Sequence, residues 1–187
     1  MATTADIKKG LCIKFKDDLW TITDFQHHKP GKGGAFMRTR LKSVTSGKTL
    51  EHTFSSGENI DIQSISRRKF QFTYKDETGY NFMDNETFEQ ITLQEDEIEG
   101  VPFMKDGQDV EVVIHDETEK ALFAELPAFV NLMITYTEPG IQGDRSSGGT
   151  KPATVETGIE IQVPLFIKQD EVVLVDTRDG SYQGRAN

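Results

Sequence analysis

The sequence predicts an all-β protein built from three consecutive small β-barrels. Three observations carry this prediction. Short segments of alternating apolar and polar residues dominate the chain, and such alternation is typical of half-buried strands. Turn-forming glycine, proline, asparagine and aspartate separate these segments. No long amphipathic helix is expected anywhere in the 187 residues.

The first barrel is predicted over residues 1–65. Its strand-like segments are joined by short polar turns, among them Lys16-Asp17-Asp18 and Thr45-Ser46-Gly47. Four or five strands within about 60 residues form a small and strongly curved barrel. The expected strands are 11–15, 19–25, 36–44 and 48–54.

The second barrel is predicted over residues 66–127 and the third over residues 128–187. Each has about five short strands in about 60 residues, which is the size of an OB-type barrel. A hairpin is expected at Asp76-Glu77-Thr78-Gly79, and a short helical turn capped by Asn85 is expected over 85–90. Pro127 interrupts the pattern and marks the second boundary. The other expected strands are 69–74, 80–83, 109–114, 121–125, 129–136, 154–157, 159–163, 172–175 and one around Tyr182.

One loop of the first barrel has an unusual composition, Lys29-Pro30-Gly31-Lys32-Gly33-Gly34. Pro30 fixes its own φ, and the glycines can adopt positive φ, so a tight hairpin turn is expected. The absence of bulky neighbours would let the Lys32 ammonium project alone on a thin support. Taken by itself, such a lysine is more often simply solvated.

Charge is distributed unevenly along the chain, whose net charge is −10. Residues 1–64 carry ten Lys and Arg against seven Asp and Glu, residues 65–127 carry six against sixteen, and residues 128–187 carry five against eight. The basic excess therefore lies in the segment with the lysine loop. Such asymmetry can orient a protein on a polyanion, although a net of +3 is also within ordinary scatter.

No catalytic or metal-binding constellation is recognisable in the sequence. His27 and His28 are neighbours on an expected strand, so their side chains point to opposite faces. Cys12 lies in an apolar run and is expected to be a buried small hydrophobe. The acidic run 95–99 lacks the spacing of a calcium loop and reads as a solvated face. The chain is therefore expected not to be an enzyme and to need no metal or cofactor.

The cellular location is expected to be the cytoplasm. The N-terminus lacks the basic and apolar regions of a secretory signal, and no apolar stretch approaches the roughly 20 residues that span a bilayer. A single cysteine, Cys12, excludes an internal disulfide and a cysteine-rich zinc site. A monomer with no membrane partner is expected.

Three motifs, in this order along the chain, resemble the bacterial elongation factor P family. They are Lys29-Pro30-Gly31-Lys32-Gly33 with Ala35-Phe36; Phe82-Met83-Asp84-Asn85-Glu86-Thr87-Phe88-Glu89-Gln90; and Lys151-Pro152-Ala153, Gly158, Val163-Pro164-Leu165-Phe166 and Val175-Asp176-Thr177-Arg178. The resemblance covers essentially the whole chain. It implies a KOW/SH3-like N-terminal barrel, two OB-type barrels, and an L-shaped outline similar to a tRNA.

The resemblance also implies a function. Members of that family bind the 70S ribosome between the peptidyl-tRNA site and the exit site, contact rRNA and P-site peptidyl-tRNA, and relieve stalling at consecutive prolines. Lys32 would then reach toward the peptidyl-transferase centre, and a lysine-modifying enzyme would act on it, commonly by β-lysylation. By the same resemblance, Tyr182 and Arg185 would contact tRNA, and Gly143, Asp144 and Arg145 would face the small subunit or mRNA.

Two residues depart from the family pattern. Arg145 stands where a threonine is expected, which leaves the contact of that loop open. Asp170 stands at a turn position where a glycine is expected. We interpret this difference as a local change of the turn.

A second function remains open, that of a general single-strand RNA-binding protein made of OB-type barrels. Such proteins place aromatic and basic residues together on one sheet face, and the acidic second barrel argues against this. The glycine-rich segment 140–150 is interpreted as a flexible connection. The alternative is that its backbone amides contact RNA phosphates.

Overall fold

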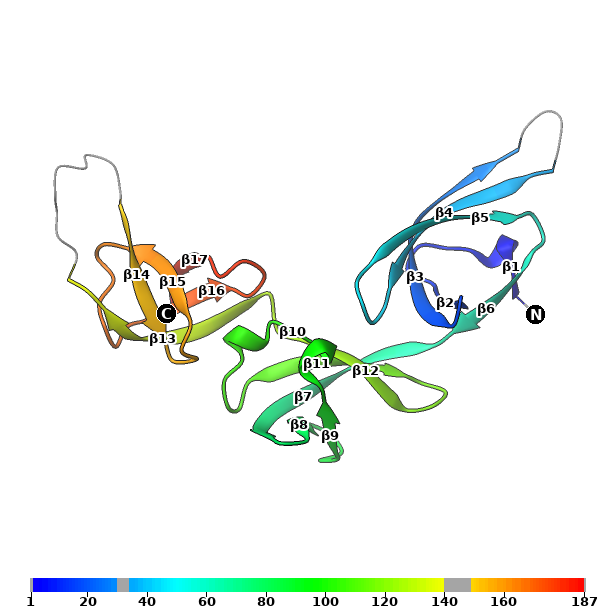
Figure 1. Cartoon of the computed structure of the whole chain (residues 1–187). Coiled ribbons are helices and arrows are strands. Elements are labelled where there is room, and N and C mark those ends of the chain that lie inside the picture. The colour runs from blue at the N-terminus through cyan, green and yellow to red at the C-terminus, as the bar shows by residue number, and fades with distance from the viewer. Residues whose placement is uncertain (1, 30–33, 140–148, 187) are drawn as a thin grey trace. The chain divides into compact units, whose positions relative to one another are not determined.

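The computed structural model describes residues 2–29, 34–139 and 149–186, and it is all-β apart from three short 3-10 helices in these ranges. The chain forms two compact units (Figure 1), each described below by itself. One unit contains Met1–Arg67 and Val113–Phe123, and the other contains Arg68–Val112 and Ala124–Asn187.

The first unit is built on a six-stranded sheet in the order β1-β6-β2-β3-β4-β5. All its neighbouring strands are antiparallel. Lys16 and Asp17 both have positive φ, of 51° and 60°, as a two-residue type I′ hairpin turn requires. The strands are β1 Ala2–Thr3, β2 Cys12–Phe15, β3 Asp18–His28, β4 Phe36–Ser43, β5 Thr49–Ser55 and β6 Asn59–Gln63, with a 3-10 helix η1 at Thr4–Asp6.

Apolar side chains from most of these strands meet in one core. Its buried members are Ile7, Ile13, Ile22, Leu41, Phe54 and Ile60. Because these residues come from β2 to β6 and the segment after η1, the sheet must curl around them, as the barrel prediction requires. A second, smaller cluster joins Cys12 and Val44 to Val113 near the end of β11.

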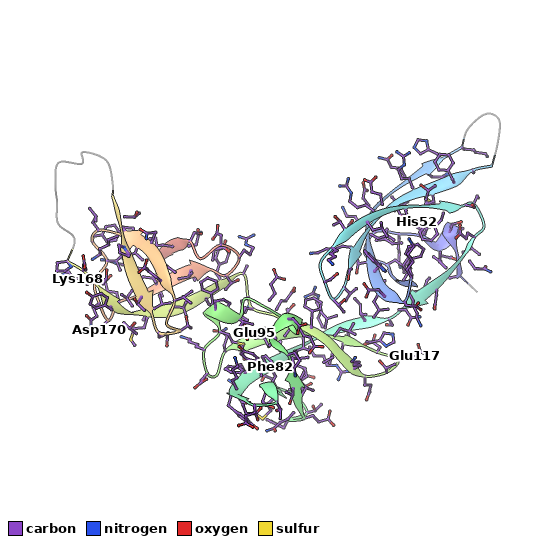
Figure 2. All side chains as sticks on the ribbon, viewed as in Figure 1. His52, Phe82, Glu95, Glu117, Lys168 and Asp170 are labelled. Carbon is purple, nitrogen blue, oxygen red and sulfur yellow. The ribbon has the colours of Figure 1, made fainter. Side chains whose placement is uncertain are left out.

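The central sheet has the order β10-β12-β11-β7-β8-β9. Its core is rich in aromatic side chains: Phe82, labelled in Figure 2, is fully buried, and its ring centroid lies 5.6 Å from that of Phe72. The strands are β7 Ile65–Asp76, β8 Gly79–Asp84, β9 Gln90–Leu93, β10 Ile98–Glu99, β11 Asp109–His115 and β12 Lys120–Glu125, with 3-10 helices η2 Glu95–Glu97 and η3 Val101–Phe103.

The C-terminal sheet has the order β15-β14-β13-β16-β17 and lies in the second unit. Strand β13 alternates regularly, with Val130, Leu132 and Ile134 buried. These side chains face a core of valines from the other strands, including Val155, Val163 and Val173. The strands are β13 Phe129–Thr137, β14 Thr150–Val155, β15 Glu160–Pro164, β16 Val172–Asp176 and β17 Tyr182–Arg185.

The prediction that Asn85 caps the short helical turn is wrong, because the cap is Asp84. The backbone N–H groups of Glu86 and Thr87 donate to the Asp84 carboxylate, at 2.7 and 3.2 Å. The segment 85–87 is a single turn and does not continue as a helix. Asp84 is the last residue of β8, so its side chain can reach both amides of the turn that follows.

Among the described residues, no helix has the length and apolar character needed to cross a membrane. The three-domain division 1–65, 66–127 and 128–187 stays a prediction. The segment 113–123, which that division assigns to the central barrel, belongs to the first compact unit.

Candidate nucleic-acid interface

The lysine loop is carried by the long hairpin of β3 and β4. The two strands are paired antiparallel up to His28 and Phe36, which face each other in the register. Lys29 and Gly34, the loop residues that flank its centre, are both exposed. Pro30, Gly31, Lys32 and Gly33 lie outside the described residues. The described part of the hairpin therefore ends with Lys29 after one strand and Gly34 before the other.

Contacts at the base of the loop hold the two strands together. The His28 and Phe36 rings are stacked, with centroids 5.2 Å apart and planes at 14°. Strand β5 supports β4 up to its first residue, because Phe36 is paired with Ser55. Beyond that pair, the Ser56 N–H donates to the Ala35 carbonyl at 2.9 Å. The loop therefore starts from a well-supported platform of three strands.

The outer face of β4 is basic. Because side chains alternate along a strand, Arg38, Arg40 and Lys42 are exposed while Thr39 and Leu41 are buried. Arg40 is partly neutralised by Glu51 on β5, with the two charged groups 3.0 Å apart. Arg38 forms no ion pair within the part of the chain that the structure describes, so its charge is available to a ligand.

A shallow hollow lies on this face next to Arg38. Its volume is about 150 Å³, and it is open to solvent. Guanidinium groups are well suited to phosphate because they donate several hydrogen bonds in a planar fork. The hairpin can thus offer positive charge along its length to a nucleic-acid backbone. The lining residues are Asp24, Phe25, Gln26, Arg38, Thr39, Arg40 and Glu51.

The other predicted contact residues belong to the second unit. Tyr182 and Arg185 lie on β17, the edge strand of the C-terminal sheet. The Arg185 guanidinium lies 5.1 Å from the Phe166 ring centroid and 3.3 Å from the Glu171 carboxylate. Arg185 is therefore already held in place by two partners. Gly143, Asp144 and Arg145 lie outside the described residues.

Asp170 keeps a glycine-like backbone. Its φ is 67°, in the left-handed region that glycine adopts without strain and that aspartate tolerates better than most residues. Its N–H donates to the Ile134 carbonyl at 2.8 Å, and its position is labelled in Figure 2. This turn therefore needs the left-handed conformation, and aspartate adopts it.

The prediction that Cys12 is buried is confirmed. Cys12 is buried, and burial together with the nearby Asp18 charge raises the pKa of its thiol to about 11. The thiolate needed for nucleophilic attack is therefore scarce at neutral pH. Among the described residues, no group of three or more His, Cys, Asp or Glu is arranged to hold a metal ion.

Sequence models of three domains match the chain in succession. They are the elongation factor P KOW-like domain at residues 3–60, the elongation factor P OB domain at residues 65–120 and the elongation factor P C-terminal domain at residues 130–185. This chain belongs to the elongation factor P family. The family resemblance inferred from the three motifs is thereby confirmed, as is the KOW-like and OB character of the fold.

Relatives in this family are similar over nearly their whole length. Elongation factor P of Amoebophilus asiaticus is 54% identical over 185 residues, which are 99% of this chain and 97% of the relative. Elongation factor P 1 of Porphyromonas gingivalis is 52% identical over 185 residues, 99% of this chain and 98% of the relative. By family, the chain is a translation elongation factor, which is a non-enzymatic role.

A solved structure supports the fold independently. It is the eukaryotic translation initiation factor 5A from Methanococcus jannaschii, with a TM-score of 0.52 and 23% identity over 67% of this chain and 90% of that chain. At this identity the likeness concerns the fold alone.

Two features of this elongation factor P family member escaped prediction from the sequence. One is the Asp84-centred turn described above. The other is the ion pair of Lys105 with Glu156, which joins the segment after η3 to the turn after β14. The Asp84 turn does have a local signal, because Asp84 precedes the two amides by two and three residues, but Asn85 is an equally common type of cap. The Lys105–Glu156 pair has no such signal, because the fold brings together residues 51 apart in sequence.

Proposed function

We propose that this protein binds the 70S ribosome between the P and E sites and promotes peptide-bond formation at consecutive prolines. Lys32 reaches toward the peptidyl-transferase centre, and the hairpin of β3 and β4 lies along the P-site tRNA. The single observation that supports the proposal is the braced hairpin of β3 and β4 in a member of the elongation factor P family. Its strands are paired up to His28 and Phe36, on either side of the lysine-loop sequence, and its outer face is basic.

In this proposal the protein acts by positioning the end of the peptidyl-tRNA. Proline is a poor substrate for peptide transfer because its ring restricts the backbone geometry. A tip that fixes the end of the peptidyl-tRNA raises the rate by orienting the reacting groups, an effect worth up to roughly 7–11 kcal/mol at its extreme. The ribosome performs the reaction, and the protein contributes no reacting group.

The basic face supports the tRNA contact in this proposal. Arg38 and Lys42 can pair with backbone phosphates, and Arg40 can do so by exchanging Glu51 for a phosphate. Such contacts are independent of base identity. The contacts assigned to Tyr182, Arg185, Gly143, Asp144 and Arg145 are part of the same proposal.

A modified Lys32 fits this mechanism. An added amine would lengthen the reach of the tip and place a further cation beside RNA phosphates. Intact-mass and peptide mass spectrometry of the protein from its native host will establish whether Lys32 carries such a group. An unmodified lysine would restrict the mechanism to the reach of the side chain itself.

The deciding experiment compares Lys32→Ala with Lys29→Ala in a translation assay that reports synthesis through Pro-Pro-Pro. Lys32→Ala is expected to abolish the rescue while the far-ultraviolet circular dichroism stays unchanged. Lys29→Ala is the matched control, since it removes a lysine from the same loop, and it should retain most of the rescue. Full rescue by Lys32→Ala would refute the proposed role of the tip.

A further inference from the structure

Phe88 is a strained and exposed residue at the turn between β8 and β9. Its φ is 61°, a left-handed value that is unfavourable for a bulky side chain. Its side chain is also exposed, with 69% of the residue accessible to solvent, the largest value among the exposed large hydrophobic residues that the structure describes. The left-handed backbone of Phe88 therefore costs conformational free energy, although its exposed side chain contributes little to any core.

The surrounding turn holds Phe88 in this conformation. The Phe88 N–H donates to the Asp84 carbonyl at 3.0 Å, and the Asp84 N–H donates to the Glu89 carbonyl at 2.9 Å. The Asp84 carboxylate, which is buried, accepts from the Glu86 and Thr87 amides. Strain of this kind persists only where neighbouring contacts enforce it, and it is concentrated at functional positions.

A rigid turn makes Phe88 a good binding anchor. Protein interfaces draw most of their affinity from a few aromatic or arginine side chains that enter apolar pockets. The entropy cost of binding is smaller when the anchor is already fixed in place. The antiparallel pairing of β8 with β9, visible in Figure 1, ends at Met83 and Gln90 and holds both ends of the turn.

The charges around Phe88 indicate what kind of partner it meets. Glu86 and Glu89 flank it and are exposed, and Arg68 is the basic residue close enough to help lower the pKa of Asp84. Across residues 65–127 there are sixteen acidic against six basic side chains. A phosphate backbone would be repelled from such a surface, whereas Lys and Arg side chains would be attracted. The surface therefore favours a basic protein over RNA.

We propose that Phe88 anchors this factor to a protein component of the ribosome by entering an apolar pocket edged by basic side chains. This inference rests on the proposed ribosomal function and assigns a partner to a turn distinct from the lysine loop. Burial of a phenylalanine side chain corresponds to about a ten- to hundredfold gain in affinity.

The first test is Phe88→Gly in the full-length protein. Glycine removes the ring and relieves the left-handed strain, so the Tm is expected to rise by about 2–4 °C. The affinity for purified 70S ribosomes is expected to fall by about ten- to hundredfold. Tyr74→Ala is the matched control, because it removes another exposed aromatic side chain from the central sheet, and it should leave the affinity unchanged.

The second test is photo-crosslinking from a p-benzoylphenylalanine at position 88 in the presence of purified 70S ribosomes. The expected product joins this residue to a ribosomal protein at a site that contains Lys or Arg. A crosslink to rRNA alone would overturn the inference, as would an unchanged affinity of Phe88→Gly. Failure of the wild-type protein to bind ribosomes would instead refute the proposed function, and this inference with it.

Discussion

The Lys105 ammonium lies 3.0 Å from the Glu156 carboxylate and joins two parts of the second unit that are 51 residues apart in sequence. Lys105 also donates to the Asn131 carbonyl at 2.8 Å. The same Glu156 oxygen accepts from the Met133 amide at 2.9 Å. These contacts tie the segment after η3 to strand β13 and to the turn after β14.

We expect the Lys105–Glu156 pair to contribute measurably to the stability of the second unit. In a double-mutant cycle of Lys105→Met and Glu156→Gln, the coupling free energy of unfolding should be about 0.5–1 kcal/mol, because both side chains are only about one-third exposed. The more exposed pair Lys75–Glu95, 3.5 Å apart, is the control and should show a coupling near zero. Equal couplings for the two pairs would contradict this prediction.

The turn before β9 should depend on the Asp84 carboxylate. Hydrogen bonds from the Glu86 and Thr87 amides lower the pKa of this group, with the Glu86 bond the largest cause. Asp84→Ala leaves both amides without their acceptor and should reduce the free energy of unfolding by about 1–2 kcal/mol, measured by urea denaturation. Asp84→Asn keeps an acceptor oxygen and should lose less of the free energy of unfolding. An equal loss for Asp84→Asn and Asp84→Ala would show that the charge of Asp84 matters more than its hydrogen bonds.

Stability at low pH should depend on Asp176. Its carboxylate accepts hydrogen bonds from the Arg178 side chain, at 2.8 Å for Nε, and from the Arg178 backbone, and these lower its pKa to about 2. Because the pKa is lower in the folded state, the stabilisation is complete above about pH 4, the unfolded value, and is lost as the pH falls from there toward 2.

Thermal unfolding measured between pH 2 and pH 6 tests this dependence. The wild type should lose Tm more steeply than Asp176→Asn across that window. Asp179→Asn is the comparison, since Asp179 lies in the same turn and its pKa is also lowered, chiefly by the Ser181 hydroxyl, but the shift is large only for Asp176. Asp179→Asn should therefore flatten the curve less than Asp176→Asn does. Parallel curves for the wild type and Asp176→Asn would contradict the assignment.

The left-handed turn before β16 offers a stabilising substitution. Asp170 is exposed and has a φ of 67°. Asp170→Gly relieves that strain and should raise the free energy of unfolding by roughly 0.5 kcal/mol after allowance for the greater freedom of glycine in the unfolded chain. Asp170→Ala cannot adopt the conformation as easily and should lower it by about 1 kcal/mol. A ranking of alanine above glycine in denaturant titrations would argue that the side chain, and not the backbone, matters at this position.

Local patterns predicted most of the strands. The hairpin of β3 and β4 was expected over 19–25 and 36–44, and the paired strands extend to His28 on one side and end at Ser43 on the other. The strands β1, β6, β9 and β10 were not predicted. β10 has only two residues and pairs in parallel with β12, so its formation depends on a partner that lies more than twenty residues away.

The sequence by itself determined the all-β class, the turn positions and the family, because these follow from alternation, from glycine and proline chemistry and from contiguous motifs. It also marked Lys32 as the candidate functional residue. Only the structure decided that Asp84, and not Asn85, accepts from the amides of the turn before Phe88, because both residue types are common caps and the choice depends on where β8 ends. Only the tertiary structure decided that Lys105 meets Glu156, because that contact depends on how segments 51 residues apart in sequence come together.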